Sequence, residues 1–308
     1  MTRPIVVLCG GVGAAKLLRG LIQVVPAERL VAVVNVADDM VLHGLSISPD
    51  LDTITYTLAD AVSLERGWGL EGESWQAMTM LKRYGGQAWF GLGDRDLGTH
   101  LYRTQRLSEG ATLSEVTAEI ARAWDLPLTL TPVSNDRIST IMTTAEFGDI
   151  SFQRYFVGHQ HDVVVTAVRF DGAAAATAAP GVVAALEAAE RIIIAPSNPV
   201  VSIDPVLAVP EVGEILRRRR SDVVAISPII GGKALKGPAD RLLTELGRQS
   251  SVVGVAEWYR DVIGTLIIDQ QDSALAADIE AIGLGCRVLP TIMSTPEDAA
   301  ALGAACLQ

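Results

Sequence analysis

The chain has 308 residues, of which 49% are hydrophobic, enough for one large α/β domain with a sizeable core. Its formal net charge of -11 argues against a broad nucleic-acid surface, so anionic ligands must be met by local groups of donors. The widely spaced cysteines (Cys9, Cys286 and Cys306) form no disulfide framework, and no stretch has the roughly 18 apolar residues of a membrane span, so we expect a cytoplasmic protein with no membrane partner.

The first motif is a glycine-rich turn between a predicted strand at 5–8 and a predicted helix that opens at 14–21. Glycines let a backbone approach an oxyanion, and the N–H groups at a helix start favour negative charge. Lys16 stands where the dinucleotide fingerprint has a third small residue, and it can serve as a charge partner. The pattern predicts a cradle for a nucleotide diphosphate, formed by Gly10, Gly11, Gly13 and Lys16. The alternative is a plain strand-to-helix turn with a solvated lysine.

Four aspartates follow the second predicted strand, 30–34, within fifteen residues: Asp38, Asp39, Asp50 and Asp52. Ligands of open α/β sheets collect at the carboxyl ends of strands, which places these carboxylates near the glycine turn. Such hard oxygen ligands suit a Mg²⁺ ion that also bridges a substrate's phosphates. We therefore predict a magnesium site. The alternatives are a solvated acidic loop and, for Asp52, the N-cap of a helix over 53–61.

A compressed run of aromatic residues, glycines and charges at 89–100 predicts a binding loop. Trp89 and Phe90 are suited to stacking on a flat ring, and Asp94, Asp96 and His100 to bonding its polar edge. The alternative is that the aromatic residues belong to the core and the charges pair on the surface.

The middle of the chain predicts a smaller inserted subdomain at about 130–175. Alternating or apolar runs at 138–142, 151–157 and 163–168 predict its strands. Turn chemistry alone explains Asn135 and Asp136, and we expect His159 and His161, in a polar connection, to be exposed.

Two further strand ends carry polar groups. The predicted strand 191–195 ends in Ser197 and Asn198 between prolines, which suits phosphate or ribose. The predicted strand 222–226 leads into a second anion cradle with Ser227, Gly231, Gly232 and Lys233. The alternation of strands and helices predicts one Rossmann-like α/β domain over 1–308 with a mostly parallel sheet. An oxidoreductase would need an acidic residue at the end of the second strand, where Asn35 stands instead.

Together these motifs resemble the 2-phospho-L-lactate transferase family of coenzyme F(420) biosynthesis. The resemblance runs almost from end to end and is carried by the segments 10–16, 35–39, 48–53, 91–100, 134–137, 195–199 and 227–233. It implies a transferase that moves a phosphorylated three-carbon acid from a guanosine diphosphate adduct to the ribityl hydroxyl of the deazaflavin Fo, releasing GMP with Mg²⁺. It also implies a homodimer. Of phospholactate, phosphoenolpyruvate and phosphoglycerate, we prefer phosphoenolpyruvate as the transferred group, which gives dehydro-F(420)-0.

The resemblance also implies roles for individual residues. It places the guanosine diphosphate part against both cradles and the Ser-Asn pair, that is Gly10, Gly11, Gly13, Lys16, Ser197, Asn198, Ser227, Gly231, Gly232 and Lys233. It places Fo near Asp52, Gly91, Asp94, Asp96, His100, Asn135 and Asp136. We assign the Mg²⁺ to Asp38, Asp39 and Asp50, and the catalytic roles to Asp38, to Lys16 as a phosphate partner and to Asp52 as the base or the residue that orients Fo.

A second class of function competes with the transferase. A non-enzymatic, nucleotide-sugar-binding regulator of a sister group shares the Gly-Gly turn, the segment 35–39 and the fold. The segments 91–97 and 134–137 resemble the transferase instead. A thermal shift with a UDP-sugar, but none with GDP or Fo, would favour the regulator.

Overall fold

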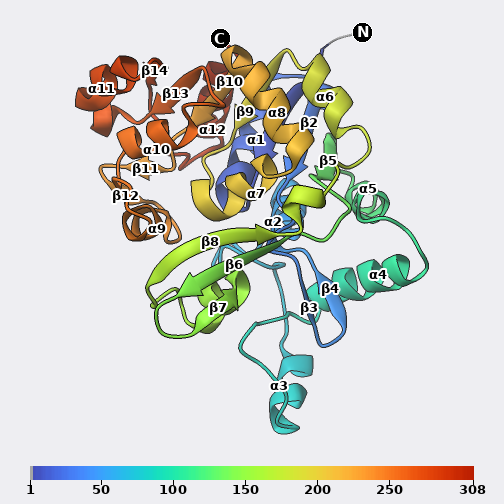
Figure 1. Ribbon diagram of the computed structural model, residues 1–308. Helices are drawn as coiled ribbons and strands as arrows, with labels where there is room; N and C mark the ends of the chain where they lie inside the picture. Colours follow the sequence, from blue (N-terminus) through green and yellow to red (C-terminus); the bar gives the residue numbers. More distant parts are fainter. Residues whose placement is uncertain (1–2) are drawn as a thin grey trace.

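The computed structural model describes residues 3–308, and in that range a sheet of seven parallel strands forms the centre (Figure 1). In spatial order the strands are β14 (Gly285–Val288), β13 (Thr265–Ile268), β10 (Val223–Ile226), β9 (Arg191–Ile194), β1 (Ile5–Cys9), β2 (Leu30–Val34) and β5 (Thr129–Pro132). Every residue of β1 is buried, which requires cover on both faces of the sheet. The predicted Rossmann-like class is confirmed.

Helices flank this sheet or, like the helix Gln76–Arg83, belong to an extension beyond it. They are α1 (Val12–Val24), α2 (Pro49–Leu58), α3 (Gln76–Arg83), α4 (Asp96–Ser108), α5 (Leu113–Ala123), α6 (Val182–Ala188), α7 (Asp204–Leu207), α8 (Pro210–Arg218), α9 (Ala239–Glu245), α10 (Val252–Tyr259), α11 (Ala276–Ala281) and α12 (Pro296–Cys306). Short 3₁₀ turns are η1 (Ala27–Arg29), η3 (Ala173–Ala175), η5 (Arg220–Asp222) and η6 (Gln270–Leu275), and π-helical turns are η2 (Arg154–Gly158) and η4 (Pro199–Ile203). In residues 3–308 no helix is both long and apolar enough to cross a membrane.

The order of the strands reverses next to β1. The chain runs from β1 outward to β2 and β5, and then returns to β9 on the other side of β1. Open α/β sheets bind ligands at such a reversal, outside the carboxyl ends of the strands. The glycine turn after β1 and the Ser197–Asn198 pair after β9 therefore meet at the expected ligand position.

A small antiparallel sheet of β7 (Gly148–Ser151), β6 (Ser139–Thr144) and β8 (Val165–Asp171) is inserted in the middle of the chain and lies below the main sheet in Figure 1. The strand predicted at 151–157 is wrong, because η2 takes up most of that segment. Phe152 and Tyr155 are both buried and stand three residues apart, which is the spacing of a helical face.

The prediction that His159 and His161 are exposed is also wrong. His159 stacks on Phe147 at 4.4 Å between ring centroids, and His161 stacks on Phe156 at 5.5 Å. Both histidines are half-buried as a result.

Two hairpins lie outside the main sheet: β3 (Met40–Leu42) with β4 (Leu45–Ile47), and β11 (Ile229–Ile230) with β12 (Lys233–Ala234). The first hairpin shares a small separate core with α3 and the loop before α4, formed by Leu42, Ile47, Met78 and Leu92. This core supports an extension that ends in α3, at the bottom of Figure 1.

Candidate functional site

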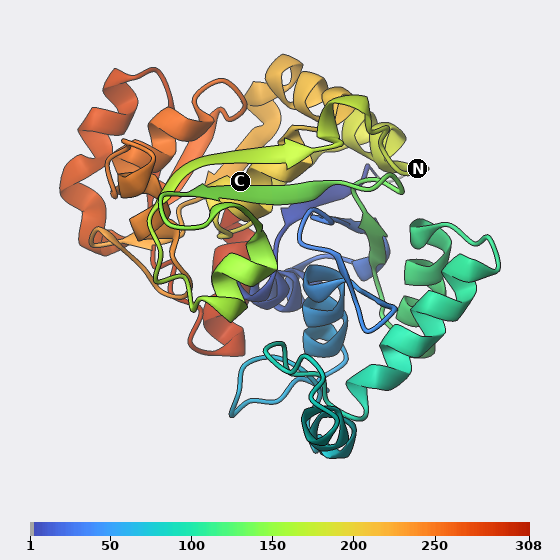
Figure 2. The same cartoon turned by 60° about the horizontal axis from the view of Figure 1, so that its bottom comes forward.

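A cavity of about 810 Å³ lies at the carboxyl ends of the central strands. Segments from the whole chain line it: the glycine turn, Asp38, the first turn of α2, the 66–69 loop, the start of α4, η2 and the residues before it, 196–202, 227–230, 235–239 and 291–294. Of the residues predicted from the sequence, it collects Gly11, Gly13, Lys16, Asp38, Asp50, Asp52, Gly91, Asp96, His100, Ser197, Asn198 and Ser227. Figure 2 shows the molecule turned so that the bottom of Figure 1 comes forward.

The glycine turn is packed closely against Pro196 and Asp50. A Cβ at Gly13 would lie 2.2 Å from the carbonyl oxygen of Pro196, and a Cβ at Gly11 would lie 3.0 Å from Oδ1 of Asp50. Gly10 lies beneath the cavity surface, where its N–H donates to Oγ of Ser197 at 3.2 Å. The turn therefore joins the ends of β1 and β9 and brings backbone against the acidic cluster.

The other residues predicted for the nucleotide are held by local hydrogen bonds. Lys16 is exposed and donates from Nζ to the carbonyl oxygen of Met293 at 3.2 Å. Asn198 accepts the N–H of Val200 at 3.0 Å and caps η4. Ser227 is buried and bonds the backbone of Ile229. Of these side chains, the lysine has the greatest freedom to meet a ligand.

Asp38 and Asp50 bring two carboxyl groups together at the cavity wall. Asn35 donates from Nδ2 to Oδ2 of Asp50 at 3.0 Å. Oδ1 of Asp38 is buried and has no hydrogen-bond partner among residues 3–308. Burial raises the pKa of Asp38 well above its usual range, helped by the charges of Asp50 and Asp39, and burial raises the pKa of Asp50 to about 6. Crowded, buried carboxyl oxygens of this kind fit a divalent cation.

Asp39 faces away from this pair. Its Oδ2 accepts a hydrogen bond from Oγ of Ser48 at 2.6 Å, and the residue lines a second cavity of about 320 Å³. Burial raises the pKa of Asp39 despite the bond from Ser48. Asp39 therefore lines a different cavity from the other two predicted magnesium ligands, although its charge still acts on Asp38.

Asp52 lies in the first turn of α2. The interpretation of Asp52 as an N-cap is wrong, because Pro49 begins the helix and Ser48 is the N-cap residue. The Asp52 carboxylate is buried and accepts hydrogen bonds from both terminal nitrogens of Arg103, from Nη1 at 3.1 Å and from Nη2 at a shorter distance. Sequence reasoning missed Arg103; its only signal was a position three residues after His100 in a predicted helix.

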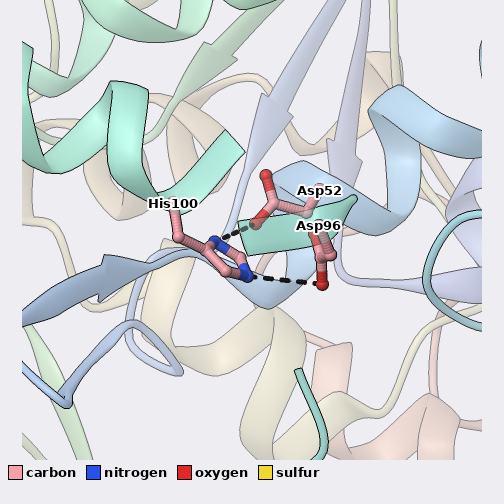
Figure 3. Close-up of side chains that lie close together, drawn as sticks. All are labelled: Asp52, Asp96 and His100. Carbon is pink, nitrogen blue, oxygen red and sulfur yellow. Dashed lines mark ion pairs between the residues drawn. The ribbon is translucent and has the colours of Figure 1, made fainter. Parts of the chain in front are cut away.

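Asp52, Asp96 and His100 gather at the same end of the cavity (Figure 3). Nε2 of His100 lies 3.3 Å from Oδ2 of Asp96, and Nδ1 lies 3.7 Å from Oδ2 of Asp52. Asp96 also accepts the hydroxyl of Tyr56 at 2.5 Å. Burial works against the ionised form of Asp96, but its close contacts with His100 and Tyr56 and the charge of Arg103 outweigh burial and lower the pKa.

Aromatic side chains that sequence reasoning did not assign also line the cavity. Trp68 lies beneath the guanidinium of Arg66, 5.8 Å from the ring centroid, and Phe152 and Phe156 stack at 5.3 Å. Residues 235–239 and 291–294 complete the wall. The segment 235–239 belongs to the second predicted anion cradle, whereas no motif signalled 291–294, which only the fold brings to the cavity.

Besides Gly10 and Asp39, six predicted site residues lie outside this cavity: Asp94, Asn135, Asp136, Gly231, Gly232 and Lys233. Asp94 accepts two backbone N–H groups at the start of α3. Oδ1 of Asn135 accepts the N–H of Ser114 at 2.8 Å, and Oδ2 of Asp136 accepts the N–H of Thr177 at 2.8 Å. Gly231 and Gly232 form the turn of the β11–β12 hairpin, where the N–H of Gly231 donates to Asp272. The ligand roles of these six residues stay predictions from the resemblance.

The fold and cavity define an α/β protein with a ligand site at its strand-order reversal. The family model described as "2-phospho-L-lactate transferase CofD" matches residues 5–282. The chain therefore belongs to the 2-phospho-L-lactate transferase family, as the resemblance implied.

Curated relatives match this chain over nearly its full length. A protein of Kitasatospora aureofaciens named phosphoenolpyruvate transferase is 42% identical over 299 residues, covering 95% of this chain and 93% of its own. One of the same name from Mycobacterium avium is 41% identical and covers 99% of this chain and 98% of its own. A Methanosarcina mazei protein named 2-phospho-L-lactate transferase is 36% identical and covers 95% of each chain.

A solved structure shares the fold. A protein of the upf0052 family from Bacillus halodurans superimposes with a TM-score of 0.64 at 17% identity, with all of both chains covered. At this identity the likeness concerns the architecture alone.

Proposed function

We propose that this protein is a transferase of coenzyme F(420) biosynthesis that moves phosphoenolpyruvate from a guanosine diphosphate adduct to the ribityl hydroxyl of Fo, giving dehydro-F(420)-0 and GMP. The observation that carries the proposal is the joint placement of two groups of residues in one cavity. The glycine turn, Lys16, Asp38 and Asp50 suit a diphosphate, while Asp52, His100 and the aromatic wall suit a polar heteroaromatic acceptor.

The choice of donor follows the relatives. Those at 40 to 42% identity include several named phosphoenolpyruvate transferase, whereas the Methanosarcina mazei relative named for phospholactate is 36% identical. This difference favours the enolpyruvoyl donor, in line with the expectation from the sequence.

The chemistry is displacement at phosphorus, in which the protein must place a hydroxyl in line and neutralise charge on the diphosphate. Backbone N–H groups of the glycine turn and the ammonium of Lys16 meet the diphosphate oxygens. Asp52, held by Arg103, accepts a hydrogen bond from the attacking hydroxyl and orients it. Asp38 and Asp50 would hold Mg²⁺, which supplies further charge neutralisation on the transferred phosphoryl group and the GMP leaving group. A homodimer and a cytoplasmic location belong to the same proposal and rest on the family resemblance.

The test is incubation of the purified protein with Fo, Mg²⁺ and, separately, the guanosine diphosphate adducts of phosphoenolpyruvate, phospholactate and phosphoglycerate. Mass spectrometry of the deazaflavin should show the phosphoenolpyruvate product together with GMP. Product from phospholactate or phosphoglycerate instead would change the donor and keep the transferase. No product from any adduct, combined with a thermal shift by a UDP-sugar, would overturn the proposal in favour of the regulator.

A further inference from the structure

Arg103 lies behind the acceptor end of the cavity and contacts two residues that line it. Its side chain on α4 is buried, and the residue is 2% exposed. Besides its two bonds to the Asp52 carboxylate, its Nη1 lies 3.3 Å from Nδ1 of His100 and 3.3 Å from the carbonyl oxygen of Ser46 in β4. A single guanidinium therefore connects Asp52, His100 and the β3–β4 hairpin.

This contact favours one of the two neutral tautomers of His100. A guanidinium has five N–H donors and no acceptor, and it stays charged. Nη1 of Arg103 can bond Nδ1 of His100 only if Nδ1 accepts, because a proton on Nδ1 would face another donor at 3.3 Å. A hydrogen bond between these two atoms therefore goes with the neutral tautomer of His100 that carries its proton on Nε2.

In that tautomer the Nε2 proton is available at the cavity wall. Nε2 lies 3.3 Å from Oδ2 of Asp96, but the contact is not aligned as a hydrogen bond, and this buried atom has no other partner among residues 3–308 (Figure 3). Tyr56 holds Asp96 in place through its hydroxyl. A buried N–H that is poorly paired gains stability when a ligand supplies an acceptor.

A metal ion is the other occupant that this cluster suggests. Ligand atoms of Asp52, Asp96 and His100 lie within 4.8 Å of one another. Arg103, however, already bonds both oxygens of Asp52 and Nδ1 of His100, so a cation would face a guanidinium at close range. The positive charge of the guanidinium therefore disfavours a metal ion at these three residues.

We propose that Arg103 is a positioning residue for the acceptor, an inference that rests on the proposed function. It fixes the Asp52 carboxylate and holds His100 as the Nε2–H tautomer, so that the Nε2 proton hydrogen-bonds an oxygen of the acceptor substrate.

The first experiment reads the tautomer directly and needs no substrate. Two-dimensional ¹⁵N–¹H NMR of the ligand-free protein labelled in histidine rings distinguishes protonated from bare ring nitrogens. The chain has four histidines, and a His100→Gln variant identifies the signals of His100. We expect protonated Nε2 and bare Nδ1 in the wild type, and a mixture of tautomers in Arg103→Met. A wild-type His100 with its proton on Nδ1 would overturn the proposal.

The second experiment is kinetic and has a matched control. Arg103→Met, and Arg103→Lys in case the first variant does not fold, should raise the KM for Fo about tenfold to a hundredfold, as loss of the partner that orients a histidine does elsewhere. The KM for the donor should stay unchanged. Arg106, on the same helix, pairs with Glu109 and Glu119 at the surface, so Arg106→Met should change neither constant.

The two possible failures are distinguishable. Arg103 variants that match Arg106→Met, or that raise both KM values equally, overturn the positioning role. Absence of turnover with every adduct overturns the proposed function instead, and the NMR measurement then still decides whether Arg103 sets the tautomer of His100.

Discussion

Gly13 is the position where one methyl group would disturb the cavity most directly. The added Cβ would lie 2.2 Å from a backbone oxygen of Pro196, which would have to move together with Ser197 and Asn198. We expect Gly13→Ala to lower the free energy of unfolding by about 1–3 kcal/mol, as overpacking does, and to weaken binding of a guanosine diphosphate ligand. Urea denaturation and titration calorimetry measure the two effects.

Gly98 supplies the control for that substitution. It lies on the exposed side of α4, and a Cβ there would meet no atom within 4 Å among the described residues. Gly98→Ala should raise the free energy of unfolding by about 0.5–1 kcal/mol, because alanine is the better helix former. A loss of similar size in both variants would show that close packing at Gly13 is not the cause.

The Asp38 carboxyl should lower the stability of the metal-free protein and be required for metal binding. Its carboxyl is buried beside Asp50 and Asp39 and carries an oxygen that has no hydrogen-bond partner in residues 3–308. We expect Asp38→Asn to raise the Tm in EDTA, because one of three crowded carboxyls is removed, and to abolish the increase in Tm caused by Mg²⁺ as well as turnover. Calorimetry with and without Mg²⁺ tests this. Asp162→Asn, whose side chain is 93% exposed, should behave as the wild type.

At the scale of elements, α3 and α4 cap each other: a carboxylate just before each helix accepts hydrogen bonds from N–H groups at the start of the other helix. Asp94, just before α4, accepts two N–H groups at the start of α3 at 2.8 and 3.0 Å, and Glu73, just before α3, accepts two at the start of α4, both at 2.8 Å. The hydrogen bond from the Ser74 hydroxyl lowers the pKa of Asp94 most, and the bonds from these N–H groups lower it further. Asp94 and Glu73 thus have a structural role that needs no ligand.

The cap makes a testable prediction. Asp94→Ala should lower the stability of the protein, as loss of an N-cap does, and should speed hydrogen exchange within 76–83 more than elsewhere. The kcat of the transferase should stay close to that of the wild type. A large fall in kcat with unchanged exchange in α3 would instead support the substrate contact predicted from the sequence.

Element prediction succeeded where local pattern and burial agree. The apolar run 30–34 coincides with β2, because a strand buried on both faces has no competing pattern. The segment 151–157 failed because alternation of apolar residues does not distinguish a strand from one helical turn when the segment is short. Asp52 was assigned to the wrong helix position because Pro49 starts α2 earlier than the apolar run suggests.

At the scale of the whole molecule, the site was predictable where it consists of strand ends. Parallel strands end on one edge, so the order of strands and turns along the chain is enough to predict that Gly11, Asp38 and Ser197 meet. Asn135 and Gly231 lie elsewhere, because Asn135 follows the edge strand β5 and Gly231 forms the turn of the β11–β12 hairpin. Arg103 and the 291–294 segment reach the site through tertiary packing alone.

Asp204 links α7 to α10 and makes the stability of the whole fold depend on pH. Both of its carboxylate oxygens lie 2.9 Å from Nε1 of Trp258, and burial raises its pKa to about 7 despite this bond. Between about pH 4 and pH 7 the folded protein therefore binds more protons here than the unfolded chain, so the free energy of unfolding falls as pH rises through this window.

Removing the charge at Asp204 should relieve this penalty. Asp204→Asn keeps an acceptor for Trp258, and we expect it to raise the free energy of unfolding at pH 8 by on the order of 1–3 kcal/mol, with a much smaller gain near pH 4, where the carboxyl is already protonated in the folded state. Asp261→Asn removes the same charge from an exposed position and should change stability little at either pH. Urea denaturation of the three proteins at both pH values measures the effect, and an equal gain at pH 4 and pH 8 would show that ionisation of Asp204 is not its source.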